Sequence, residues 1–269
     1  GYMIYDTLFA MDETFNVHPQ MAKSHSVSSD GLVHTITLRD GLKWHDGSAV
    51  ESADCIASIA RWGKRDGMGQ QLMAVVDSMD AVDANTFTIK LTQPWGLLTT
   101  ALGKMSSNVP FMMPAEKAAT DAFEQVPMPL IGSGPFKFIE AEWVPGSKVV
   151  YEKFADYIPR SEPASGASGG KIAGYDRVEW LYIPDQNSAM NALIAGEVDY
   201  FEDPQSDLYQ ILEAADGVKT ELSDNYGNQG WLRINHLNPP FDNVKARHAV
   251  QLLVDQEMYL QAIVGSPDL

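Results

Sequence analysis

The stretch from Ser28 to Val50 constrains the fold more than any other part of the chain, because it combines a strand pattern with three Asp-Gly pairs. Residues 32–39 alternate with a period of two, which predicts a half-buried β-strand. The Asp-Gly pairs at 30–31, 40–41 and 46–47 supply glycines that accept the positive backbone angles of tight turns. The stretch therefore predicts a strand bounded by turns, with His45 and Asp46 in the loop before the next helix.

The rest of the chain mixes strand and helix patterns without strict alternation. Further strands are expected at 86–91, 135–144, 148–154, 176–183, 198–202, 218–222 and 230–235. Helices are expected from Ser52, as the N-cap, to about Trp62, from Asp185 to Gly196, near 206–214, and from Asn243 to about Gly265. The fold class that follows is α+β or mixed α/β.

Charge and composition exclude several functions. The chain carries 36 acidic and 19 basic side chains, for a formal net charge of −17. Phosphate binding needs clustered Lys and Arg, so nucleic acid and anionic membrane surfaces are not expected partners. No run of about 18 apolar residues predicts a membrane span. Cys55 is the one cysteine, so no internal disulfide is possible.

The sequence motifs that could indicate catalysis or metal binding are weak. The Gly- and Ser-rich composition of segment 161–174 predicts a linker between subdomains or a mobile surface loop. It contains Ser168 in a G-x-S-x-G pattern, which in hydrolases needs a strand-to-helix elbow that the flanking residues do not predict. We favour the flexible loop and keep a Ser hydrolase as the alternative. The six histidines show no metal-binding spacing, so neither a metal site nor a cofactor is predicted.

Five stretches, in chain order, carry a resemblance to one family. They are "AKSHSVSSDGLVHTITLRDGLKWHDGSAVESAD" (22–54), "IGSGPFKF" (131–138), "VVYEKFADYIP" (149–159), "ALIAGEVDYFE" (192–202) and "INHLNPPFDNVKARHAVQLLVD" (234–255). Together they resemble the bacterial extracellular solute-binding proteins of the peptide/nickel class, family 5. The chain departs from the family pattern at Cys55, where a small aliphatic residue is usual, and in the longer segment 161–174.

The resemblance implies a periplasmic binding protein type II-like lobe, incomplete, with a family-specific extra β-rich subdomain. Residues 1–170 would form this subdomain of lobe one, and residues 171–243 the main-sheet part of lobe one. Residues 244–269 would begin lobe two, whose remainder would be absent, and a signal segment would lie outside this chain. In such a subdomain the loop Trp44-His45-Asp46-Gly47 is expected to be structural.

The implied function is solute capture for an ABC-type importer, without enzymatic activity. Oligopeptides or dipeptides are the expected solutes, and another small solute such as a nickel chelate is the alternative. The implied partners are the membrane subunits of the transporter. The implied location is the periplasm, or an extracytoplasmic, membrane-associated position.

The ligand site is expected on loops near the hinge of the family fold. The loop 225–231 offers amides and an aromatic platform, although a simple turn there remains an open alternative. The expected ligand-binding residues are Tyr226, Asn228, Gln229 and Trp231 in this loop, Gln70 in "DGMGQQ" (66–71) and Asn108 in "SSNVPFMMP" (106–114).

Overall fold

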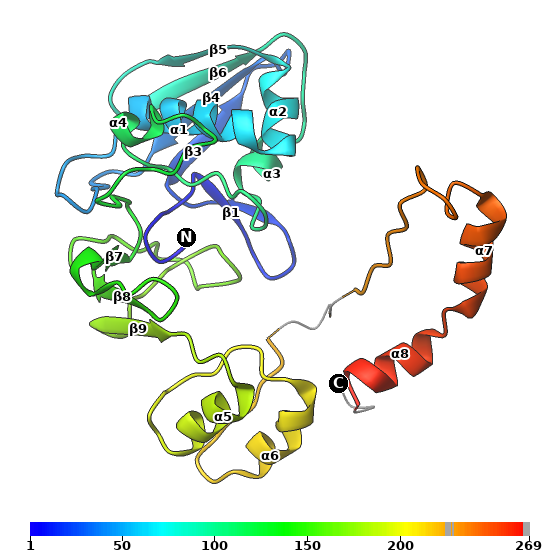
Figure 1. Ribbon diagram of the computed structural model, residues 1–269. Helices are drawn as coiled ribbons and strands as arrows, with labels where there is room; N and C mark the ends of the chain where they lie inside the picture. The colour runs from blue at the N-terminus through cyan, green and yellow to red at the C-terminus, as the bar shows by residue number, and fades with distance from the viewer. Residues whose placement is uncertain (224–226, 228, 266–269) are drawn as a thin grey trace. The chain divides into compact units, whose positions relative to one another are not determined.

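The computed structural model describes residues 1–223, 227 and 229–265 (Figure 1). The chain divides into two compact units, Gly1–Leu181 and Tyr182–Leu269, each of which is described by itself. Among the described residues, no helix has the length and apolar character needed to cross a membrane.

A four-stranded antiparallel sheet forms the larger part of the first unit. Its strands are β3 (Ala22–Val27), β4 (Val33–Leu38), β5 (Val76–Ala81) and β6 (Thr86–Leu91), in the order β3-β4-β6-β5. The strands expected at 32–39 and 86–91 are β4 and β6, which pair with Ile36 opposite Phe87. Both side chains are fully buried, so the period-two alternation correctly predicted the inward face.

The turns around β4 also form as expected. Gly31, Gly41 and Gly47 all have positive φ angles, of 75°, 77° and 90°. A further hairpin, β1 (Phe9–Met11) with β2 (Val17–Pro19), precedes the sheet. The sequence pattern did not predict this hairpin, because each of its strands has only three residues.

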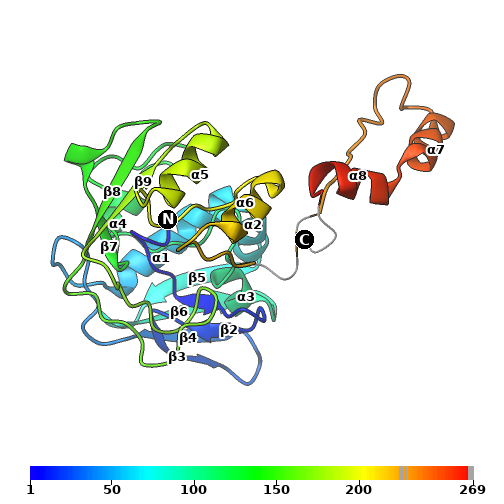
Figure 2. The same ribbon diagram turned by 90° about the horizontal axis from the view of Figure 1, so that it is seen from below.

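Four short helices belong to the same unit. They are α1 (Ser52–Arg65), α2 (Gly67–Met73), α3 (Leu98–Leu102) and α4 (Ala115–Ala118). Helix α1 contacts β5, β6, α2 and α4, and it lies along one face of the sheet (Figures 1 and 2). The buried core between these layers includes Trp44, Ile59 and Leu72.

Helix α1 starts differently from the sequence prediction. Glu51, and not Ser52, is the N-cap, and the helix continues past Trp62 to Arg65. The Asp54 carboxylate accepts a hydrogen bond from the Glu51 backbone N–H at 2.9 Å, as in a capping box. The Ser52 hydroxyl donates instead to the Asp83 carbonyl, a contact that local sequence does not reveal.

A second antiparallel sheet completes the first unit. Its strands are β7 (Phe136–Phe138), β8 (Lys148–Lys153) and β9 (Arg177–Leu181), in chain order. The strand expected at 135–144 is shorter, because a 3-10 helix, η1 (Glu140–Glu142), follows β7. The domain division remains a prediction, but this sheet crosses its expected boundary after residue 170, since β9 pairs with β8.

In the described residues of the second unit, the regular secondary structure consists of helices, joined by turns and irregular chain. Its helices are α5 (Gln186–Ile194), η2 (Ser206–Leu208), α6 (Tyr209–Ala214), α7 (Val244–Leu253) and α8 (Gln256–Ile263). As expected, Asp185 caps α5, and Gly196 follows it with φ 72°. Asn243 caps α7, but Asp255 caps a separate helix, so the expected single stretch to Gly265 is broken.

The strands expected at 198–202, 218–222 and 230–235 are not formed in the described residues. A strand exists only where a neighbouring strand satisfies its backbone groups. In the described part of Tyr182–Leu269 no strand is present to provide that pairing. The prediction of strands at these three positions was therefore wrong.

Candidate functional site

The N-terminal segment runs beside the chain that leads into β7. The Gly134 N–H donates to the Ile4 carbonyl at 2.8 Å, and the Phe136 N–H donates to the Met3 carbonyl at 2.9 Å. A Cβ atom at Gly132 or Gly134 would overlap the backbone of Ile4. The glycines of "IGSGPFKF" are therefore needed for close approach of two backbones.

His45 forms hydrogen bonds to the same two glycines, Gly132 and Gly134. Its Nε2–H donates to the Gly134 carbonyl at 3.1 Å, and its Nδ1 accepts from the Gly132 N–H at 3.3 Å. Because Nδ1 accepts a hydrogen bond, the two bonds together require the neutral imidazole. Burial lowers the pKa of His45 to about 4. With Trp44 almost fully buried, the loop Trp44-His45-Asp46-Gly47 is structural, as the sequence predicted.

His45 should make the first unit acid-sensitive. Between its ordinary pKa of about 6.5 and its folded value of about 4, the unfolded chain binds a proton that the folded chain does not. The free energy of unfolding should therefore fall by roughly 2–3 kcal/mol as the pH drops through that window. Urea denaturation of wild type and His45→Gln at several pH values measures this contribution as a difference.

The difference in pH dependence between wild type and His45→Gln isolates the contribution of His45 from those of the other titrating groups. His25 and His34, whose ring nitrogens lie 3.0 Å apart, also have pKa values lowered by burial, and they are unchanged in the variant. The difference in free energy of unfolding between wild type and variant should become smaller from pH 7 to pH 4. A difference that stays constant over this range would contradict the assignment to His45.

The Gly- and Ser-rich segment 161–174 is neither a linker nor a free loop. The Ala167 N–H donates to the Met11 carbonyl at 2.9 Å, and the Gln20 side-chain amide donates to the Gly169 carbonyl at 3.2 Å. A Cβ at Gly169 would overlap the Pro163 carbonyl. The small residues therefore serve close packing within the first unit, which corrects the expectation of a mobile linker.

Ser168 does not have the setting of a nucleophile. Its residue is 5% exposed, and its hydroxyl donates to the Ser165 carbonyl at 2.9 Å. The segment forms a tight turn in which Ser165 and Ser168 make an isolated bridge. A hydrolase elbow would place the Ser between a strand and a helix, and neither flanks Ser168.

The Ser168→Ala variant should therefore leave ester hydrolysis by the purified chain at the buffer background, as in wild type. It should lower the free energy of unfolding by about 1 kcal/mol, the usual value of one neutral hydrogen bond. A p-nitrophenyl acetate assay and urea denaturation measure the two effects. Wild-type turnover that disappears in the variant would instead establish the hydrolase.

A buried ion pair joins this loop to the N-terminal segment. Lys171 Nζ lies 2.7 Å from Asp6 Oδ1, with side chains 16% and 1% exposed. Asp6 also accepts from the Thr7 N–H at 2.9 Å and from the Tyr157 hydroxyl at 3.0 Å. Burial, followed by the Asp6 charge, raises the pKa of Tyr157 above its ordinary value, so that hydroxyl remains a donor.

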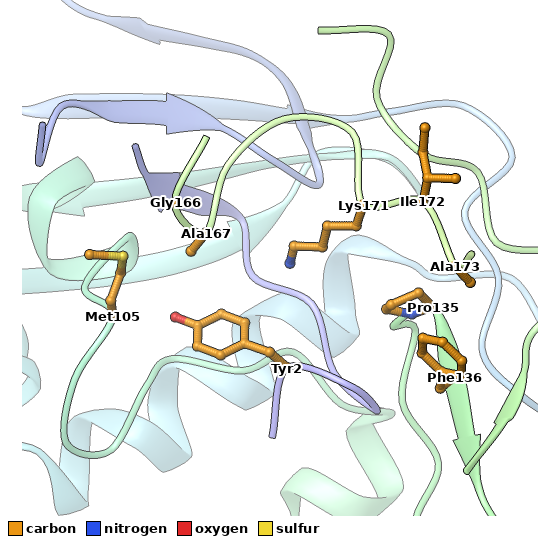
Figure 3. Close-up of a pocket in the computed structure, with 9 residues that line it drawn as sticks. All are labelled: Tyr2, Met105, Pro135, Phe136, Gly166, Ala167, Lys171, Ile172 and Ala173. Carbon is orange, nitrogen blue, oxygen red and sulfur yellow. The ribbon is translucent and has the colours of Figure 1, made fainter. Parts of the chain in front are cut away.

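A pocket of about 440 Å³ opens between these segments. It is lined by Tyr2, Met105, Pro135, Phe136, Gly166, Ala167, Lys171, Ile172 and Ala173 (Figure 3). The lining is mainly apolar, with the Lys171 ammonium and the Tyr2 hydroxyl as its side-chain hydrogen-bonding groups. Mostly apolar walls with a few polar groups are typical of small-molecule sites. We therefore take this pocket as the candidate site.

The loop that carries Met105 is held by a second buried pair. Lys104 Nζ lies 2.5 Å from Asp66 Oδ2, and it also donates to the Ser107 carbonyl at 2.8 Å. Asp66 Oδ1 in turn accepts from the backbone N–H groups of Met68 and Gly69, which start α2. The pair fixes the loop against the junction of α1 and α2.

Two of the expected site residues lie at this junction. Gln70 donates from its side chain to the Lys64 carbonyl at 3.1 Å, and the Asn108 carbonyl accepts from the Trp62 indole N–H at 2.5 Å. Both residues are exposed, and neither lines the pocket. Their role in ligand binding remains a prediction.

The other expected site residues belong to the second unit. Trp231 is 84% exposed, and Gln229 is exposed. Tyr226 and Asn228 lie outside the described residues. Sequence reasoning did not select Tyr2, Met105 or Lys171, which line the pocket. Within the described residues, no three His, Cys, Asp or Glu side chains are grouped to hold a metal ion.

The fold is that of a periplasmic binding protein. The structure of DppA from Helicobacter pylori in complex with the peptide STSA matches with a TM-score of 0.78 and 24% identity, over 98% of this chain and 53% of that one. AgaA from A. tumefacien R10, in complex with agropinic acid, matches with a TM-score of 0.64 and 26% identity, over 80% of this chain and 41% of that one.

The chain belongs to the bacterial extracellular solute-binding proteins, family 5, whose profile matches residues 16–268. It is 41% identical over 98% of its length to a probable peptide ABC transporter periplasmic-binding protein of Sinorhizobium fredii. It is 26% identical over 96% of its length to the glutathione-binding protein GsiB of Pectobacterium atrosepticum. The chain spans about half the length of these curated relatives, 49% and 47%.

Proposed function

We propose that this chain takes part in capturing peptides for an ABC-type importer, and that the pocket beside Tyr2 contacts the peptide. The observation that carries the proposal is the 41% identity, over 98% of the chain, to a protein named as a peptide ABC transporter periplasmic-binding protein. The periplasm is the corresponding location, and the membrane subunits of the transporter are the corresponding partners.

The chemistry of the pocket supports a peptide ligand. Phe136, Met105 and Ile172 provide apolar surface of different shapes, and the flexible Met side chain adapts to different ligand groups. Lys171 and the backbone at Gly166 and Ala167 border the same space. Receptors for varied peptides commonly combine main-chain hydrogen bonds with tolerant side-chain pockets.

The hydrogen bonds of Ser168 and His45 support ligand binding without catalysis. The Ser168 hydroxyl is engaged with the Ser165 carbonyl at 2.9 Å. Burial lowers the pKa of His45, whose two ring nitrogens are both engaged with backbone groups. These side chains therefore hold the fold, and we propose that captured peptides leave the protein intact.

Saturation-transfer NMR tests the proposal, because it detects binding as weak as millimolar. The ligands are Ala-Leu-Ala, free leucine and a nickel–histidine chelate, which represents the alternative solute. We expect signal transfer to the tripeptide, and its loss in Tyr2→Ala. Phe123→Ala is the matched control, since Phe123 is 70% exposed and does not line the pocket.

Mass spectrometry of the same samples should recover Ala-Leu-Ala uncleaved. Transfer to the chelate alone would replace the peptide with a metal complex as the proposed solute. Equal transfer to the tripeptide in wild type and Tyr2→Ala would remove the pocket from the proposal.

A further inference from the structure

Lys171 is the one charged residue among the nine that line the pocket. Its ammonium lies 5.2 Å from the centroid of the Tyr2 ring, and both side chains face the hollow in Figure 3. An uncompensated ammonium in a mostly apolar pocket would attract carboxylates strongly. Whether the pocket selects anions therefore depends on what neutralises Lys171.

Asp6 provides that neutralising charge from behind the pocket wall. Its side chain is 1% exposed, and it lies 2.7 Å from Lys171 Nζ without lining the pocket itself. The Thr7 N–H and the Tyr157 hydroxyl fix its two oxygens in place. Asp6 is thus held as a permanent partner of Lys171 and has no surface to offer a ligand.

Tyr2 adds no charge to this arrangement. Burial, followed by the Asp6 charge, raises the pKa of its phenol to about 12, so the group is neutral at physiological pH. The pocket therefore presents donors, the phenol O–H and the remaining ammonium N–H groups, on a wall whose charges cancel. A neutral carbonyl can accept these hydrogen bonds without bringing an unpaired charge into the pocket.

We propose that Asp6 determines the charge preference of the pocket by neutralising Lys171, so that the pocket selects apolar groups with an uncharged carbonyl over carboxylates and ammonium groups. This inference rests on the proposed function, because it names the class of peptide group that the same pocket takes. Asp6 acts through Lys171 and is therefore a positioning residue.

Phenylacetamide and phenylacetate test the preference, because they have the same shape and differ in charge. Binding of each is titrated at pH 7 by NMR. Wild type should bind the amide about fivefold more tightly than the acid, and Asp6→Asn should reverse the order by a similar factor. Asn keeps an acceptor for the Thr7 N–H, whereas it leaves the Lys171 ammonium without its countercharge.

The double variant Asp6→Asn/Lys171→Met removes both charges, and the amide should again bind more tightly. A merely structural role for Asp6 would weaken both probes equally in Asp6→Asn and would not reverse their order. If circular dichroism shows that Asp6→Asn does not fold, the proposal is tested by the binding of the two probes to wild type. Tighter binding of phenylacetate than of phenylacetamide would then overturn the proposal. Failure of both probes to bind wild type would also overturn it.

The two probes separate this inference from the proposed function. If Ala-Leu-Ala binds but the order of the probes is unchanged by Asp6→Asn, the charge preference is wrong and peptide capture stands. If the order reverses as expected while no peptide binds, the charge preference stands and peptide capture is wrong.

Discussion

Replacing Trp44 by alanine should lower the free energy of unfolding by about 4 kcal/mol, the usual cost of removing a large aromatic side chain from a core. Trp44 is 1% exposed, and its indole N–H donates to Asp54 Oδ2 at 3.1 Å. Asp54 also binds the N–H groups of Glu51 and Ala115. The substitution therefore leaves a cavity and loosens the start of α1. Urea denaturation followed by circular dichroism measures the loss.

Trp180→Ala is the matched control for this prediction. Trp180 lies on β9, at the edge of the second sheet, and is 52% exposed. Its removal should cost at most about 1 kcal/mol, since half of its surface is already in contact with water. Equal losses in the two variants would contradict a core role for the Trp44-His45-Asp46-Gly47 loop.

Replacing Asp66 by alanine should cost about 3–5 kcal/mol, because it leaves Lys104 largely buried without its partner. The Lys104 and Asp66 side chains are only 18% and 5% exposed. The substitution also removes the acceptor for the N–H groups of Met68 and Gly69 at the start of α2. Urea denaturation measures the stability, and the tripeptide titration measures whether the Met105 loop keeps its place in the pocket.

Asp80→Ala provides the comparison for an exposed ion pair. Asp80 lies 3.2 Å from Lys90, and both side chains are about half exposed, at 54% and 49%. Such surface pairs contribute about 0–1 kcal/mol. If Asp66→Ala were no more costly than Asp80→Ala, the Lys104 pair would not hold the loop.

The sequence predicted those elements whose pattern is local. β4 and β6 follow from alternation over six residues each, and the turns at Gly31 and Gly41 follow from Asp-Gly pairs. The start of α1 was wrong by one residue, because the Asp83 carbonyl, 31 positions away, engages the Ser52 hydroxyl. Tertiary contacts of this kind override the preference for Ser at a cap.

The candidate site could not be predicted in the same way. The Asp6–Lys171 pair joins residues 165 positions apart, and Lys171 lies in a segment whose composition is typical of a linker. The stretch "IGSGPFKF" supported the family resemblance, but it did not predict a pocket. The sequence identified the family, whereas the pocket depends on how distant segments come together.

The position of peptide contact is the central claim, and amide chemical shifts of the isotope-labelled chain test it most directly. On titration with Ala-Leu-Ala, the largest shifts should fall at Gly166, Ala167 and Ile172, which line the pocket. The backbone amide of Phe123, which does not line the pocket, should move little. No shift at the three pocket residues, whatever moves at Gln70 or Trp231, would contradict the account.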